Sequence, residues 1–167
     1  YYLMMNSDAA QGGLSSVWQD TAPTSTVFSV GSSSETNYNG HTYVAYCWAE
    51  IPGFSKFGSY SGNSSSDGPF LDTGFKPKFF MMKKYTSNDS VTAHWQVMDA
   101  LRDPISPNQY EISPDTSAAE VTSGAGSWDF LSNGIKIRSS DTYTNYSGEK
   151  YIYVAFAESP FKYANAR

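Results

Sequence analysis

The sequence feature that most constrains the fold is a pair of matching apolar segments, residues 43–50 (YVAYCWAE) and 151–158 (YIYVAFAE). Each follows an Asn-Tyr-x-Gly turn, and each is followed by a proline two residues after its glutamate. Aromatic and β-branched residues favour a pleated strand. Because neither face of either segment is polar before the glutamate, we expect both to be central strands covered on both faces.

Other short motifs recur in the same order before these two segments. Residues 1–6 resemble residues 79–84, and each is followed by a Trp-Gln pair and then by a phenylalanine-containing strand. The sequence therefore predicts two related units, residues 1–57 and 79–163, joined by a connecting loop over residues 58–78. Because the first unit lacks the lead-in that precedes the second, we expect the chain to be the C-terminal part of a longer polypeptide.

The composition favours one all-β domain. A chain of 167 residues can bury a sizeable core, and its many aromatic residues alternate with stretches rich in Gly, Ser, Thr, Asn and Asp. We predict an antiparallel β-sandwich, jelly-roll-like and built from the two related units, over residues 1–167. Asn133-Gly134 is a strong signal for a two-residue hairpin turn. Cys47, the single cysteine, is expected to be a small apolar core residue.

Several classes of function are disfavoured by charge and by the absence of motifs. The formal net charge is -5, and no basic cluster is longer than Lys83-Lys84, which argues against a nucleic-acid partner. The apolar runs are too short to cross a bilayer, so we expect no membrane insertion. The chain contains none of the common phosphate, zinc, nucleophile or calcium motifs, so we predict no catalytic residue, cofactor or metal. Asp67 and Asp72 can supply oxygens to calcium, but Asp-Gly is more common in turns.

Tyrosines among small polar residues suggest a site for carbohydrate, because a ring stacks on a sugar face while Asn and Asp bind its hydroxyls. Four residues fit this pattern and are the predicted ligand-binding residues: Tyr60, Asn63, Asp67 and Tyr110. The composition of turns and surface loops explains the same pattern equally well.

Glu50 and Glu158 occupy equivalent positions in the two segments. Two carboxylates that face each other can hydrolyse a glycosidic bond. The favoured interpretation is structural: each glutamate ends a buried strand and accepts hydrogen bonds from the loop backbone that follows.

Several blocks together resemble an uncharacterised domain of marine and environmental tailed bacteriophages, often placed after a concanavalin-like lectin domain in tail-fibre-like structural proteins. The blocks are spread between residue 53 and the C-terminus: GFSKFGSYSGN (53–63), DGPF (67–70), DTGFKP (72–77), WDFLSNG (128–134) and YIYVAFAESPFKYANAR (151–167). The resemblance implies a virion component that is extracellular after release and homo-oligomeric. It supplies no catalytic residues.

The resemblance and the aromatic strands favour a fibre or appendage domain that displays loops for attachment to a host-surface glycan or protein. Two alternatives stay open. One is a structural or decoration protein that only packs against other virion subunits, and the other is a glycan-cleaving enzyme.

Overall fold

The computed structural model describes residues 1–122 and 127–158, and these fall into two compact units. The first consists of Tyr1–Met4 and Gln11–Trp48, and the second takes in Met5–Ala10 and the chain from Ala49 onward. The first unit contains one short helix, α1 (Ser15–Trp18), and an isolated bridge between Tyr2 and Gly12. All the named strands belong to the second unit.

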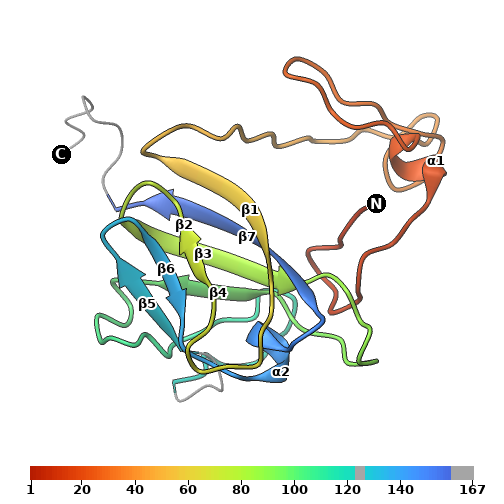
Figure 1. The fold of residues 1–167 in the computed structure, drawn as a ribbon. Coiled ribbons are helices and arrows are strands. Elements are labelled where there is room, and N and C mark those ends of the chain that lie inside the picture. Colours follow the sequence, from red (N-terminus) through yellow and green to blue (C-terminus); the bar gives the residue numbers. More distant parts are fainter. Residues whose placement is uncertain (123–126, 159–167) are drawn as a thin grey trace. The chain divides into compact units, whose positions relative to one another are not determined.

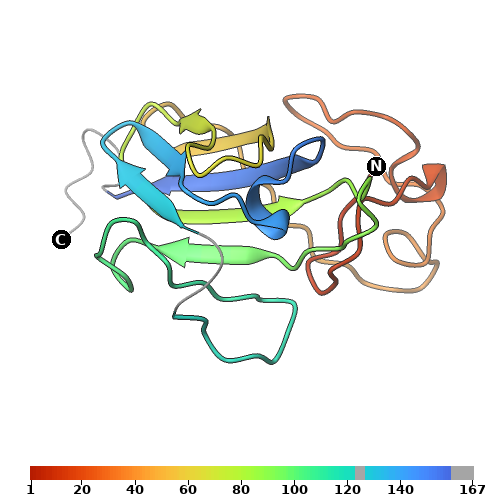
Figure 2. The same ribbon diagram turned by 60° about the horizontal axis from the view of Figure 1, so that its bottom comes forward.

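The second unit is an antiparallel β-sandwich, which confirms the predicted fold class (Figure 1). One sheet has the order β1-β7-β3-β4 and the other the order β2-β6-β5. The strand bounds are β1 (Ser55–Ser61), β2 (Phe70–Asp72), β3 (Pro77–Lys84), β4 (Gln96–Asp99), β5 (Trp128–Leu131), β6 (Gly134–Ile137) and β7 (Lys150–Ala157). A second helix, α2 (Thr142–Asn145), precedes β7, and Figure 2 shows the two sheets as separate layers.

Strand β7 is the centre of the larger sheet, as its sequence predicts. It pairs antiparallel with β1 on one edge and with β3 on the other. Its inward residues Tyr151, Tyr153 and Ala155 are buried, whereas the alternate positions are half-buried. The outward side carries an aromatic cluster in which Phe156 contacts Phe57, at a centroid distance of 6.2 Å. The prediction that both faces are fully covered is therefore met on one face only.

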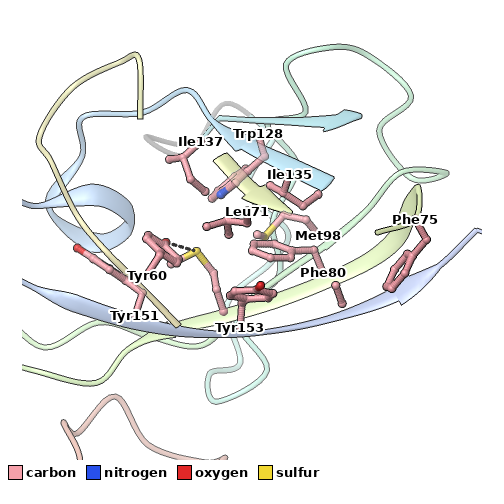
Figure 3. Packing of buried hydrophobic residues seen from close by; sticks show 12 residues of the cluster. Tyr60, Leu71, Phe75, Phe80, Met98, Trp128, Ile135, Ile137, Tyr151 and Tyr153 are labelled. Carbon is pink, nitrogen blue, oxygen red and sulfur yellow. Dashed lines mark hydrogen bonds between the residues drawn. The ribbon is translucent and has the colours of Figure 1, made fainter. Parts of the chain in front are cut away.

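The core fills the space between the two sheets (Figure 3). Trp128, Ile135 and Ile137 come from the smaller sheet and are completely buried. Because side chains alternate along a strand, these residues all point to the same face as Leu71 of β2. The larger sheet contributes an opposing set: Tyr60, Phe80, Met82, Met98, Tyr151, Tyr153 and Ala155.

The prediction for residues 43–50 is wrong. These residues form no strand and are exposed along their whole length, and Cys47 is exposed rather than in the core. The predicted counterparts at residues 1–6 and 26–30 also form no strand, so the two predicted units do not build matching halves of the sandwich. The physical reason is that a central strand needs partners on both edges. Residues 1–50 contain no counterpart of β1 and β2, the strands that precede β3.

The predicted hairpin between β5 and β6 is confirmed, but its two turn residues are Ser132 and Asn133. Gly134 begins β6 and lies opposite Leu131 in the register. A Cβ at Gly134 would be 2.8 Å from the Phe70 ring and would also collide with the Leu71 carbonyl. The close approach of β2 therefore requires glycine at this position.

A substitution at Tyr60 tests how much hydrogen bonding inside the core contributes to stability. Its ring stacks on Tyr151 at 4.8 Å, and its hydroxyl donates to the Thr144 carbonyl at 2.7 Å. Tyr60→Phe keeps the stacking but leaves a buried carbonyl without this donor, so we expect a loss of about 1–2 kcal/mol in the free energy of unfolding. Urea denaturation measures it. Tyr143→Phe, at an exposed tyrosine of α2, is the matched control and is expected to be neutral. Equal stability of the two variants would contradict the role given to the Tyr60 hydroxyl.

Candidate functional site

Tyr60, one of the predicted ligand-binding residues, is not accessible to a ligand in the structure. The residue is buried, and burial raises the pKa of its hydroxyl well above the ordinary value. It lies on the inward side of β1, stacked against Tyr151 (Figure 3). The expectation of an exposed ring is therefore wrong, because the alternation of β1 directs this side chain into the core.

Asn63 and Asp67 lie in one ordered loop between β1 and β2. The Asn63 carboxamide donates to the Asp67 carbonyl at 3.3 Å and accepts from the Ser65 amide at 3.0 Å. Asn145, which is buried at the end of α2, donates to the Asn63 side-chain oxygen at 2.8 Å. Asn63 therefore shapes the loop, although both Asn63 and Asp67 are exposed to solvent.

Tyr110 belongs to a different loop. Its backbone amide donates to the Asp103 carboxylate at 3.1 Å, and the Gln109 amide donates to the same oxygen at 2.7 Å. The tyrosine is half-buried. Among the described residues, no contact joins Tyr110 to the loop that carries Asn63 and Asp67. The four predicted residues therefore do not form one site.

A group of interacting aromatic and charged side chains lies on the outer face of the smaller sheet, and Phe70, Asp67 and Arg138 are its exposed members. Lys136 of β6 is opposite Phe70 of β2 on one side and opposite Asp129 of β5 on the other. Directly opposed residues of antiparallel strands point to the same face, so these three side chains form a row across the sheet. We call this row, together with Asp67 and Arg138, the outer shelf.

Phe70 is the apolar part of the outer shelf. Its ring lies over Gly134, where there is no side chain, and 43% of the residue is exposed. Leu71, the next residue, points the opposite way into the core. The pleat of β2 therefore holds an aromatic ring against the sheet with one face open to solvent.

Ion pairs fix the charged part of the outer shelf. Asp67 Oδ1 lies 2.7 Å from Lys136 Nζ and 3.7 Å from an Arg138 nitrogen. Arg138 Nε in turn donates to Asp129 at 2.6 Å, and the Ser106 hydroxyl donates to the other Asp129 oxygen at 2.6 Å. Lys136 also donates to the Gly68 carbonyl. Two cations and two carboxylates thus hold one another in place, while 81% of the Asp67 side chain stays exposed.

The two carboxylates of the outer shelf remain ionised for different reasons. The hydrogen bond from Lys136 lowers the pKa of Asp67, and the charges of Lys136 and Arg138 add to this effect. For Asp129, burial by itself would raise the pKa. The hydrogen bonds from Ser106 and Arg138 and the charges of Arg138 and Lys136 together outweigh burial, so the pKa lies below its ordinary value.

The outer shelf combines an open aromatic ring, fixed donors and an exposed acceptor. A ring of this kind packs on an apolar face, and pre-positioned polar groups bind hydroxyl, amide or carboxylate groups. Sequence reasoning identified Asp67 only. A two-residue turn at Asn133-Gly134 would pair Asp129 with Arg138, whereas the observed turn pairs Asp129 with Lys136, so the hairpin signal did not predict this pair. Phe70 was not predictable either, because its position depends on how β2 pairs with β6.

Glu50 and Glu158 are each engaged by a lysine. Glu50 lies 2.6 Å from Lys56, and Glu158 lies 2.9 Å from Lys76. The hydrogen bond from Lys56 lowers the pKa of Glu50, and the Phe57 amide acts in the same direction. Each glutamate is therefore held in an ion pair with a lysine.

The basic pair Lys83-Lys84 is buried. Lys84 contacts both Asp89 oxygens at 3.1 and 3.0 Å, and Lys83 donates to the Ala93 carbonyl at 2.7 Å. Burial lowers the pKa of Lys83. Both ammonium groups therefore act inside the fold and are not presented to a phosphate backbone.

Within residues 1–122 and 127–158, no group of three or more His, Cys, Asp or Glu side chains is placed to hold a metal ion. In the same part of the chain, no helix has the length and apolar character needed to cross a membrane.

Comparisons with known proteins give one match. A family model described as a domain of unknown function, DUF7483, matches residues 1–160. Neither a curated protein nor a solved structure matches the chain significantly.

The lowered pKa of Asp129 predicts that the stability of the fold depends on pH. Because its pKa is lower in the folded protein than in the unfolded chain, its contribution is present above the unfolded value, about 3.9, and is lost as the pH falls through the folded value. Asp129→Asn is expected to lower the free energy of unfolding by about 1.5–3 kcal/mol at pH 7 and by much less below pH ~3. Urea denaturation at both pH values tests this. Asp20→Asn, at an exposed carboxylate, is the control. A deficit of equal size at both pH values would refute the ionic role of Asp129.

Proposed function

The chain belongs to the DUF7483 family, and we propose that it is a non-enzymatic domain of a bacteriophage fibre or appendage that attaches to host-surface glycans. The outer shelf is the proposed binding site. The observation that carries this proposal is the open Phe70 ring beside the exposed Asp67 carboxylate. The sequence blocks that resemble phage tail-fibre-like proteins support the virion context.

A sugar presents an apolar face of C–H groups and a rim of hydroxyls. The Phe70 ring offers a flat partner for the apolar face, and the Asp67 carboxylate accepts hydrogen bonds from two neighbouring hydroxyls. Lys136 and Arg138 supply donors on the same side. Because the ion pairs already hold these side chains, little conformational entropy is lost when a ligand binds.

Attachment is favoured over glycan cleavage by the geometry of the glutamates. Glu50 and Glu158 are each paired with a lysine, whereas the outer shelf offers binding groups in a fixed arrangement. The alternative of a purely structural virion protein uses the same surface in another way, since Phe70 and Leu131 are both exposed apolar residues of the smaller sheet. On that alternative the partner is another virion subunit, and isolated glycans do not bind.

In the proposed setting the protein is extracellular after release and acts as a homo-oligomer. A single shelf of this size is expected to bind one sugar weakly. Several copies that engage one cell surface gain avidity without any new contact. The site needs no cofactor, and its partner is a host-surface glycan.

Phe70→Ala tests the proposed site. Loss of the ring removes the stacking surface, so binding to a glycan array or to host cells is expected to fall at least ~10-fold, in line with the roughly 1–3 kcal/mol that one buried aromatic contributes. Tyr143→Ala removes an exposed ring from α2 and is the matched control. Circular dichroism checks that both variants fold.

Two results would overturn this proposal. One is full binding by Phe70→Ala, which would locate the site elsewhere. The other is absence of binding by the unaltered protein across neutral, acidic and amino sugars, which would favour the purely structural role.

A further inference from the structure

An exposed apolar segment, most of which belongs to the first unit, is not used by the proposed attachment function. Residues 41–50 are exposed throughout and form neither helix nor strand. Three alternate side chains are conspicuous: Val44, Tyr46 and Trp48 are 76%, 77% and 67% exposed. The rings of Tyr46 and Trp48 stack at 6.2 Å, so they already lie on one side of the backbone. A continuous apolar surface of this kind marks an interaction site.

The backbone of this segment also lacks partners. Among the hydrogen bonds of the described residues, none involves a backbone N–H or C=O group of residues 44–48. On either side the chain is anchored, since the His41 amide donates to Tyr38 and the Ala49 carbonyl accepts from the Ser55 hydroxyl. A row of free donors and acceptors between two fixed points is the pattern of an unpaired edge strand.

The same chain shows how such a sequence behaves when strands are available. Residues 151–158 have nearly the same pattern as residues 43–50, and all but the last of them belong to β7, the strand paired on both edges. The pattern is therefore suited to strand pairing, and residues 43–49 differ in having no strand beside them in the described structure.

We propose that residues 43–49 pair antiparallel with the same segment of a second copy of this chain. An antiparallel strand pair has a two-fold axis, so one segment is complementary to itself. The faces match as well: Val44, Tyr46 and Trp48 of one copy lie on the same side as those of the other, which forms an aromatic ladder. No charged residue lies between Tyr43 and Ala49 to oppose the pairing.

The position of Glu50 decides the direction of the pair. In a parallel arrangement the two Glu50 carboxylates would lie side by side, and like charges directly opposite one another are unfavourable. In the antiparallel arrangement they lie at opposite ends, and each keeps its ion pair with Lys56. The dimer contact is separate from the outer shelf, so it stands or fails independently of glycan binding.

Cys47 makes the pairing directly testable, because it is the single cysteine and it is exposed. Near the middle of residues 43–50, it comes close to the Cys47 of a second copy in antiparallel pairing. Treatment of the full chain with a short bismaleimide is therefore expected to give a covalent dimer, seen by intact mass. Analytical ultracentrifugation of the untreated protein is expected to show a dimer in equilibrium with monomer.

Single substitutions distinguish this contact from non-specific association. Tyr46→Pro removes a backbone donor and breaks the strand, and Val44→Lys puts a charge on the ladder, so each is expected to reduce cross-linking at least tenfold. Leu101→Lys, at a residue 66% exposed in another loop, is the matched control and leaves cross-linking unchanged. Cys47→Ser abolishes the covalent product but keeps the dimer in ultracentrifugation.

Three outcomes overturn the proposal. The first is a chain that sediments only as a monomer at all concentrations, and the second is a dimer that is unaffected by Tyr46→Pro and Val44→Lys. The third is a dimer that depends on Tyr46 but gives no Cys47 cross-link, which would place the segment against a different strand. Phe70→Ala leaves the dimer intact, so failure of glycan binding and failure of dimerisation are distinguishable.

Discussion

Backbone hydrogen bonding on both edges of β7 is the constraint on which the sandwich depends. β7 lies between β1 and β3, so every strand of the larger sheet except β4 contacts it directly. Its pleat then sends Tyr151, Tyr153 and Ala155 toward the smaller sheet and supplies one wall of the core. The opposing wall of Trp128, Ile135 and Ile137 is positioned by the β5–β6 hairpin. The fold follows from this pairing more than from the apolar character of the strand.

Residues 43–50 illustrate the same constraint by contrast. Their side chains are as suited to a central strand as those of β7, yet they are exposed because no strand lies on either side of them within the described residues. Side-chain pattern expresses a preference for a half-buried pleated surface, but burial depends on available partners. In the proposed dimer, a second copy supplies backbone hydrogen-bond partners for residues 43–49, as β1 and β3 supply them for β7.

The outer shelf depends on the sandwich in a similar way. Three strands converge so that Phe70, Lys136 and Asp129 form one row, and the loop carrying Asp67 is held over the row by Asn63 and Asn145. Networks of charge and hydrogen bonding keep the polar groups in place without filling the aromatic face. A rigid sheet with one ordered loop therefore provides the preorganisation that a weak ligand requires.

The sequence by itself determined the all-β class, the strand at β7, the β5–β6 hairpin and Asp67 as an exposed polar residue, because these depend on local alternation and turn chemistry. Only the tertiary structure decided that Tyr60 is buried, that Tyr110 lies in a separate loop and that Phe70 joins Lys136 and Asp129. It also decided that residues 43–50 have no strand partners. These properties depend on which segments pair across long stretches of sequence, and local pattern does not specify that choice.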